Sequence, residues 1–126
     1  MTLAFWCVLV AIVLPYGTVG IAKWRRDYDN NAPRDWLLKL EGRGRRAFHA
    51  HLNHFEALPG FAAAVIIAHL ARAPQGWVDA IAVAFIAFRV AYTAAYLADR
   101  ATLRSLLWMG GIGCVFALFA AATLGP

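Results

Sequence analysis

Polar side chains interrupt two otherwise apolar stretches of this sequence, and their spacing predicts a polar face on each of two helices. In the segment RRAFHAHLNHFEALPGF, residues 45–61, His49, Asn53 and Glu56 recur at intervals of four and three. At about 100° per residue in a helix, these three positions fall within an arc of about 60°. They predict one polar stripe that offers an imidazole, an amide and a carboxylate.

A second polar face is predicted in the segment FRVAYTAAYLADR, residues 88–100. Arg89, Tyr92, Thr93 and Tyr96 share a helical face about 100° wide. Glu56 and Arg89 stand at matching distances from the charged ends of their segments, so two antiparallel helices would bring them to similar depth. The spacing predicts an ion pair between Glu56 and Arg89, and by itself it leaves open whether that pair is structural or functional.

The histidines of HAHLNH raise the question of a metal site. No two of His49, His51 and His54 are four residues apart, and His51 and His54 are predicted to point away from the polar stripe. We therefore expect no metal site and interpret the histidines as interfacial or packing residues.

The composition places the chain in the membrane class. It has 126 residues, 62% of them hydrophobic, and its mean hydropathy is positive. The net charge of +5 comes from basic residues concentrated between apolar stretches, which is typical of cytoplasmic loops, so no nucleic-acid partner is expected. The two cysteines lie in separate apolar runs, and no disulfide is predicted.

Four apolar stretches are long enough to cross the bilayer, since about 20 helical residues span ~30 Å of hydrocarbon. They cover approximately residues 3–22, 45–70, 77–97 and 106–124. Short connections make successive helices antiparallel neighbours. The sequence predicts one domain, residues 1–126, folded as an all-α integral membrane protein with four transmembrane helices in an up-down bundle.

Basic residues give this bundle an orientation. Residues 23–46 contain eight lysines and arginines, the loop at 72–76 contains one arginine, and the third loop carries Arg100 and Arg104. The positive-inside rule then places the first and third loops in the cytoplasm and both termini outside.

Three segments, in order, resemble the MAPEG family, the membrane-associated proteins in eicosanoid and glutathione metabolism. RAFHAHLNHFEALPGF, residues 46–61, resembles the signature of the family's second helix, with its Asn-x-x-Glu pair and following Pro-x-Phe. YDNNAPRDW, residues 28–36, resembles the first cytoplasmic loop of bacterial members. FRVAYTAAYLADRATLRSLLW, residues 88–108, resembles the third helix and the Arg-Ser that opens the fourth.

The resemblance implies a homotrimer in the bacterial inner membrane, with active sites between subunits near the cytoplasmic side. Glutathione would bind there as co-substrate, and the protein's other partners would be membrane lipids and a small apolar substrate. Carried over by position, the residues that would hold glutathione are Arg25, Arg26, His49, Asn53, Glu56, Arg89, Tyr92 and Tyr96. His49 stands where many relatives have an arginine, so it would be a weaker clamp for a carboxylate.

The resemblance also places Arg104 beside the thiol of glutathione. We expect Arg104, helped by Ser105, to stabilise the thiolate for attack on an apolar electrophile or a lipid peroxide. The predicted function is that of a membrane-bound glutathione transferase or peroxidase. The alternative is a non-catalytic lipid-binding or scaffolding protein with the same fold, whereas a small multidrug exporter is disfavoured because the first predicted helix carries no charge.

Overall fold

The computed structural model describes residues 1–126 and contains five helices and no strand. The helices are α1 (Leu3–Lys23), α2 (Pro33–Leu38), α3 (Gly42–Leu70), α4 (Gln75–Leu97) and α5 (Ala101–Ala122). The prediction of an all-helical chain is confirmed, and the predicted set of four helices lacked α2. This six-residue helix lies in the basic first loop and begins at Pro33, a residue whose fixed φ suits the first helical turn.

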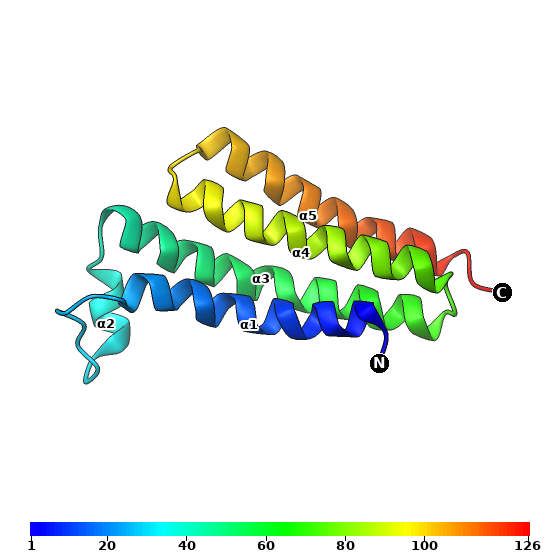
Figure 1. Ribbon diagram of the computed structural model, residues 1–126, viewed down its shortest axis with the longest axis horizontal. Helices are drawn as coiled ribbons and strands as arrows, with labels where there is room; N and C mark the ends of the chain where they lie inside the picture. The colour runs from blue at the N-terminus through cyan, green and yellow to red at the C-terminus, as the bar shows by residue number, and fades with distance from the viewer.

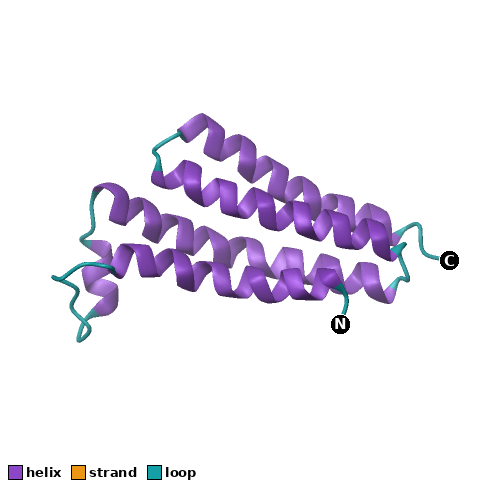
Figure 2. Cartoon of the chain, viewed as in Figure 1, coloured by secondary structure: helices purple, strands orange, loops and turns teal.

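The four long helices run antiparallel to their chain neighbours (Figure 1). α1 packs most extensively on α3, and α4 on α5. Both termini lie at one end of the bundle, while α2 and the connection from α4 to α5 lie at the other. Colouring by secondary structure shows that only short loops and the two terminal segments are not helical (Figure 2).

Three helices, α1, α4 and α5, are long and apolar enough to cross a membrane. α3 is the longest helix, at 29 residues, and carries basic residues in its first turns and Glu56 near its middle. A helix of that length measures about 43 Å, more than the ~30 Å hydrocarbon core, so its basic turns have room outside the core. A membrane crossing by α3 therefore stays a prediction.

The main hydrophobic core occupies the half of the bundle that contains the termini. It is built largely from alanines and other small side chains, which allow close helix approach. Within it, Phe61 of α3 and Phe85 of α4 stack their rings at 3.8 Å between centroids. This packed half fixes α3 against α4 one turn beyond the polar residues of both helices.

Polar contacts also join the helices outside this core. At the end with the termini, Asp79 of α4 accepts a hydrogen bond from the backbone N–H of Ala4 at 2.8 Å, which caps the first turn of α1. Near the middle, Nδ1 of His51 donates to the carbonyl of Pro15 in α1 at 2.7 Å. The His51 side chain thus points to α1, away from α4.

Close packing of α4 on α5 gives a test of the fold. A Cβ added at Gly110 would overlap the ring of Phe88, whereas one added at Gly113, on the same helix, would meet open space. Gly110→Ala should therefore lower the free energy of unfolding by about 1–3 kcal/mol. Gly113→Ala should instead be neutral or stabilise by up to about 1 kcal/mol, because alanine is the better helix former. Thermal unfolding of both variants in detergent measures the difference, and equal behaviour would contradict this packing.

Candidate functional site

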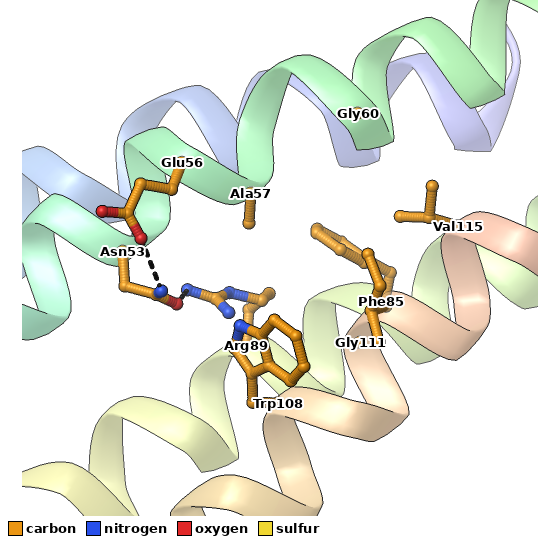
Figure 3. Close-up of a pocket in the computed structure, with 10 residues that line it drawn as sticks. Asn53, Glu56, Ala57, Gly60, Phe85, Arg89, Trp108, Gly111 and Val115 are labelled. Carbon is orange, nitrogen blue, oxygen red and sulfur yellow. Dashed lines mark hydrogen bonds between the residues drawn. The ribbon is translucent and has the colours of Figure 1, made fainter.

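A cavity of about 180 Å³ lies where α3, α4 and α5 meet (Figure 3). Its polar end is formed by Asn53, Glu56 and Arg89, and its apolar end by Phe85 and neighbouring side chains of α5. The complete lining is Asn53, Glu56, Ala57, Gly60, Phe85, Arg89, Trp108, Gly111, Ile112 and Val115. The cavity is thus an apolar hollow with charged and amide groups at one side.

Asn53 bridges the two charged groups of the cavity. Its Nδ2 donates to a Glu56 carboxylate oxygen at 2.8 Å, and its Oδ1 accepts from Nη2 of Arg89 at 3.0 Å (Figure 3). A carboxylate only accepts and a guanidinium only donates, so these partners fix which way the amide faces. The result is a carboxylate, an amide and a guanidinium in one hydrogen-bonded row.

Arg89 is 2% exposed and contacts His54, which is 3% exposed and does not line the cavity. Nε and Nη2 of Arg89 lie 3.3 and 3.1 Å from Nδ1 of His54. Because arginine can only donate, Nδ1 must be the acceptor and Nε2 must carry the proton. Nε2 then donates to the hydroxyl of Thr93 at 2.8 Å, and that hydroxyl donates to the Arg89 carbonyl at 3.0 Å.

Two predictions for this region were wrong. Glu56 and Arg89 form no direct ion pair, because Asn53 lies between them. His54 does not point away from the site but contacts Arg89. His54 follows Asn53 by one residue, and one residue corresponds to a rotation of about 100° around a helix. This rotation takes the His54 side chain off the polar stripe but does not bring it to the opposite face of α3. The sequence could have placed His54 correctly through its spacing from Ala47, Ala50 and Phe61, because these residues share the buried face of α3.

Aromatic rings connect the cavity to Arg104. The guanidinium of Arg89 lies 4.4 Å from the ring centroid of Tyr92, and that ring packs edge-on against Tyr96 at 5.6 Å. Arg104 of α5 lies 4.6 Å from the ring centroid of Tyr96. Tyr92, Tyr96 and Arg104 therefore form a row of successive contacts that leads from Arg89 on α4 to α5. None of these three predicted residues lines the cavity.

The structure does not bring the other predicted residues to the cavity. Ser105 is exposed and donates to the Ala101 carbonyl of its own helix at 3.1 Å. His49 is exposed and lies beside Phe48. Arg25 and Arg26 lie beyond the end of α1, outside the cavity lining.

Arg25 already has a partner in the loop. Its Nε and Nη2 donate to the two carboxylate oxygens of Asp27 at 2.9 and 3.0 Å. This hydrogen bonding lowers the pKa of the Asp27 carboxyl and raises the pKa of Arg25. The ion pair therefore persists to a lower pH than an isolated carboxylate would allow, although its exposure to solvent makes its contribution to stability small.

No group of three or more His, Cys, Asp and Glu side chains is arranged to hold a metal ion. The chemistry of the cavity is instead that of charge recognition. One oxygen of Glu56 has no protein partner and can accept from an ammonium, while Arg89 and Asn53 are placed to bind an anion or a carbonyl.

The fold and the cavity define a class of protein: a helical integral membrane protein with a charged and amide cluster at the side of an apolar hollow. Residues 3–124 match the sequence model of the MAPEG family. The chain belongs to the MAPEG family, and its three strongly apolar helices agree with the membrane location of that family. No curated protein matches the sequence.

The contact between His54 and Arg89 is testable by its effect on stability. His54→Leu keeps much of the side-chain volume but leaves Arg89 short of an acceptor, so the free energy of unfolding should fall by about 1–3 kcal/mol. His54→Asn retains an acceptor oxygen near the position of Nδ1 and should lose less. Thermal unfolding in detergent measures both.

His49→Leu is the control for this pair of variants, because His49 is exposed on the same helix and makes no side-chain hydrogen bond. Its effect should stay within about 0.5 kcal/mol. Equal losses for His54→Leu and His54→Asn would show that His54 contributes packing alone.

Proposed function

We propose that the protein is a membrane-bound enzyme that activates the thiol of glutathione for attack on apolar electrophiles or lipid peroxides. The observation that carries this proposal is the row formed by Glu56, Asn53 and Arg89 at the edge of an apolar cavity. Membership of the MAPEG family, some of whose members are glutathione transferases or peroxidases, supports it.

The charges of the row match those of an amino-acid end group. Glutathione carries an ammonium and a carboxylate on its γ-glutamyl residue. The free oxygen of Glu56 suits the ammonium, and the guanidinium of Arg89 suits the carboxylate. Asn53 keeps the two protein charges apart, so both can bind a ligand instead of neutralising each other.

The size of the cavity supports a site shared between subunits. At about 180 Å³ it is smaller than ligand pockets of ~300–1,000 Å³. Glu56 is exposed on the surface of the single chain, where contact with hydrocarbon would be costly. In the proposed homotrimer, a neighbouring copy covers Glu56 and completes the pocket, and Arg25 or Arg26 reaches the ligand only from that copy.

Arg104 and Ser105 are the proposed catalytic residues. The cation of Arg104 would favour the thiolate over the thiol. With an apolar electrophile, the thiolate sulfur would form a bond to carbon as the bond from that carbon to its leaving group breaks. With a lipid hydroperoxide, the sulfur would instead attack the terminal oxygen, the O–O bond would break to release the lipid alcohol after protonation, and a second glutathione would convert the resulting sulfenic acid to disulfide and water. The electrophile would enter from the bilayer past Trp108 and Ile112, which line the cavity and are 44% and 36% exposed. The contact of Arg104 with the Tyr96 ring, which leads to Arg89 through Tyr92, supports this role.

The proposed location is the bacterial inner membrane, with the first and third loops in the cytoplasm. These two loops lie at the same end of the bundle (Figure 1). Together with the adjoining turns of α1, α3 and α5 they hold ten of the twelve basic residues, which supports this orientation. Glutathione is a cytoplasmic thiol, so the orientation would give the site access to it from that end.

Binding can be tested by titrating the detergent-solubilised protein with glutathione and following thiolate absorbance near neutral pH. We expect a saturable signal in the wild type. Glu56→Gln removes the charge that would hold the ammonium and should raise the Kd by about tenfold, or ~1.4 kcal/mol. Glu41→Gln, an exposed carboxylate outside the cavity, should leave the Kd unchanged. A wild type without saturable binding would refute the proposal.

Catalysis can be separated from binding with Arg104→Ala. Loss of the cation should slow conjugation of an apolar electrophile by about 10²-fold, while the Kd for glutathione stays within about twofold. Arg100→Ala, which removes an exposed cation at the start of the same helix, should have little effect on the rate. Turnover that is unchanged in Arg104→Ala would rule out the assigned role.

One observation favours the second candidate, a non-catalytic lipid-binding or scaffolding protein. Neither Arg104 nor Ser105 lines the cavity, and half of the residues that do are hydrophobic. A protein of this kind would bind an amphipathic lipid at Arg89 and show neither thiolate absorbance nor turnover, so the same titration distinguishes the two candidates.

A further inference from the structure

The guanidinium of Arg89 has one nitrogen free to bind a ligand. Nε and Nη2 both donate to Nδ1 of His54, and Nη2 also donates to Asn53. Nη1 has no hydrogen-bond partner in the chain, but it is not sealed off, because the only fully buried side-chain atom without a partner is Nε of Arg46. Since Arg89 is almost entirely buried and lines the cavity, its Nη1 is open to the cavity.

Trp108 brings a second donor without a partner to the same cavity. An indole nitrogen can only donate. Along α5 and its C-cap, only Ser105 and Thr123 make side-chain hydrogen bonds, so Nε1 of Trp108 has no acceptor in the chain. Figure 3 shows the indole of Trp108 extending from α5 with its nitrogen turned toward the guanidinium of Arg89.

The packing of α5 on α4 holds these two donors together. A Cβ added at Gly111 would lie 3.7 Å from Cδ of Arg89 and 4.0 Å from the ring of Phe85, so α5 lies close against the stem of Arg89 at this point. Trp108 precedes Gly111 by three residues and therefore shares its face of α5. The close approach at Gly111 thus places the indole beside the head of Arg89.

A carboxylate at Arg89 needs a donor from another residue. Arginine commonly binds the two oxygens of a carboxylate with two nitrogens. Here His54 and Asn53 occupy both hydrogens of Nη2, and His54 also occupies Nε. Only Nη1 remains for the ligand, and Nε1 of Trp108 is the unpartnered donor that can reach the second oxygen.

A neutral donor also suits the charge of the site. Glu56 and Arg89 carry one charge of each sign, and the amino-acid end of a ligand adds an ammonium and a carboxylate. The four charges sum to zero. A second cation in place of Trp108 would leave an excess charge beside the apolar end of the cavity, where uncompensated charge is costly.

We propose that Trp108 is a ligand-binding residue whose indole N–H, together with Nη1 of Arg89, binds the carboxylate of the γ-glutamyl end, while Glu56 binds the adjacent ammonium. The identity of this ligand rests on the proposed function. The pair of donors makes the site selective for ligands that carry a carboxylate next to their ammonium.

The test uses the full chain in detergent and two ligands without a free thiol, with each Kd measured by isothermal titration calorimetry. S-Methylglutathione keeps the ammonium and the carboxylate of the γ-glutamyl residue. The analogue with 4-aminobutyrate in place of that residue keeps the ammonium but lacks the carboxylate. Trp108→Phe removes the indole N–H and should raise the Kd of S-methylglutathione about tenfold, the effect of one hydrogen bond to a charged group. The Kd of the analogue should stay within about twofold.

Two further variants locate the effect at the N–H. Trp108→Gln restores an N–H donor at a similar distance along the side chain, so it should bind S-methylglutathione more tightly than Trp108→Phe. Trp77→Phe is the matched control, because Trp77 is exposed in the first turn of α4 and lies outside the cavity lining. It should change neither Kd, and a loss equal to that of Trp108→Phe would contradict the assignment.

The outcomes separate this inference from the proposed function. If Trp108→Phe weakens both ligands equally while glutathione still gives thiolate absorbance in the wild type, the proposed function holds and Trp108 contributes packing alone. If only S-methylglutathione is weakened but glutathione gives no thiolate absorbance, Trp108 binds the carboxylate and the proposed thiol chemistry fails. If the wild type binds neither ligand, both proposals are overturned.

Discussion

The buried guanidinium of Arg89 is the constraint on which the rest of this bundle depends. A cation between apolar helices is costly unless it has hydrogen-bond partners. Asn53 and His54, consecutive residues of α3, supply acceptors for its Nε and Nη2, and the Tyr92 ring lies against it from its own helix. These contacts fix the register of α3 against α4, because sliding either helix by a turn would leave the charge without acceptors.

The same constraint places the cavity at a boundary within the molecule. On one side of Arg89, the stacked rings of Phe61 and Phe85 and the alanine-rich core close the bundle completely. On the other side, polar and aromatic groups follow α4 and α5 toward Arg104. A ligand at this boundary can have its charged end at the Arg89 row and its apolar part against Phe85 and α5, an arrangement that the proposed reaction of a hydrophilic thiol with a hydrophobic electrophile would need.

The sequence by itself determined the helical membrane class, the family, and the residues Asn53, Glu56 and Arg89 as one cluster, because helical periodicity and hydropathy are local properties of the chain. It did not determine which of these side chains touch. In the structure, Asn53 links Glu56 to Arg89 in place of the predicted direct ion pair. His54, which was predicted to point away from the polar stripe, contacts Arg89. Only the tertiary structure decided these contacts, because hydrogen-bond partners depend on how α3 is rotated and shifted against α4. The periodicity of a single helix does not specify that rotation or shift.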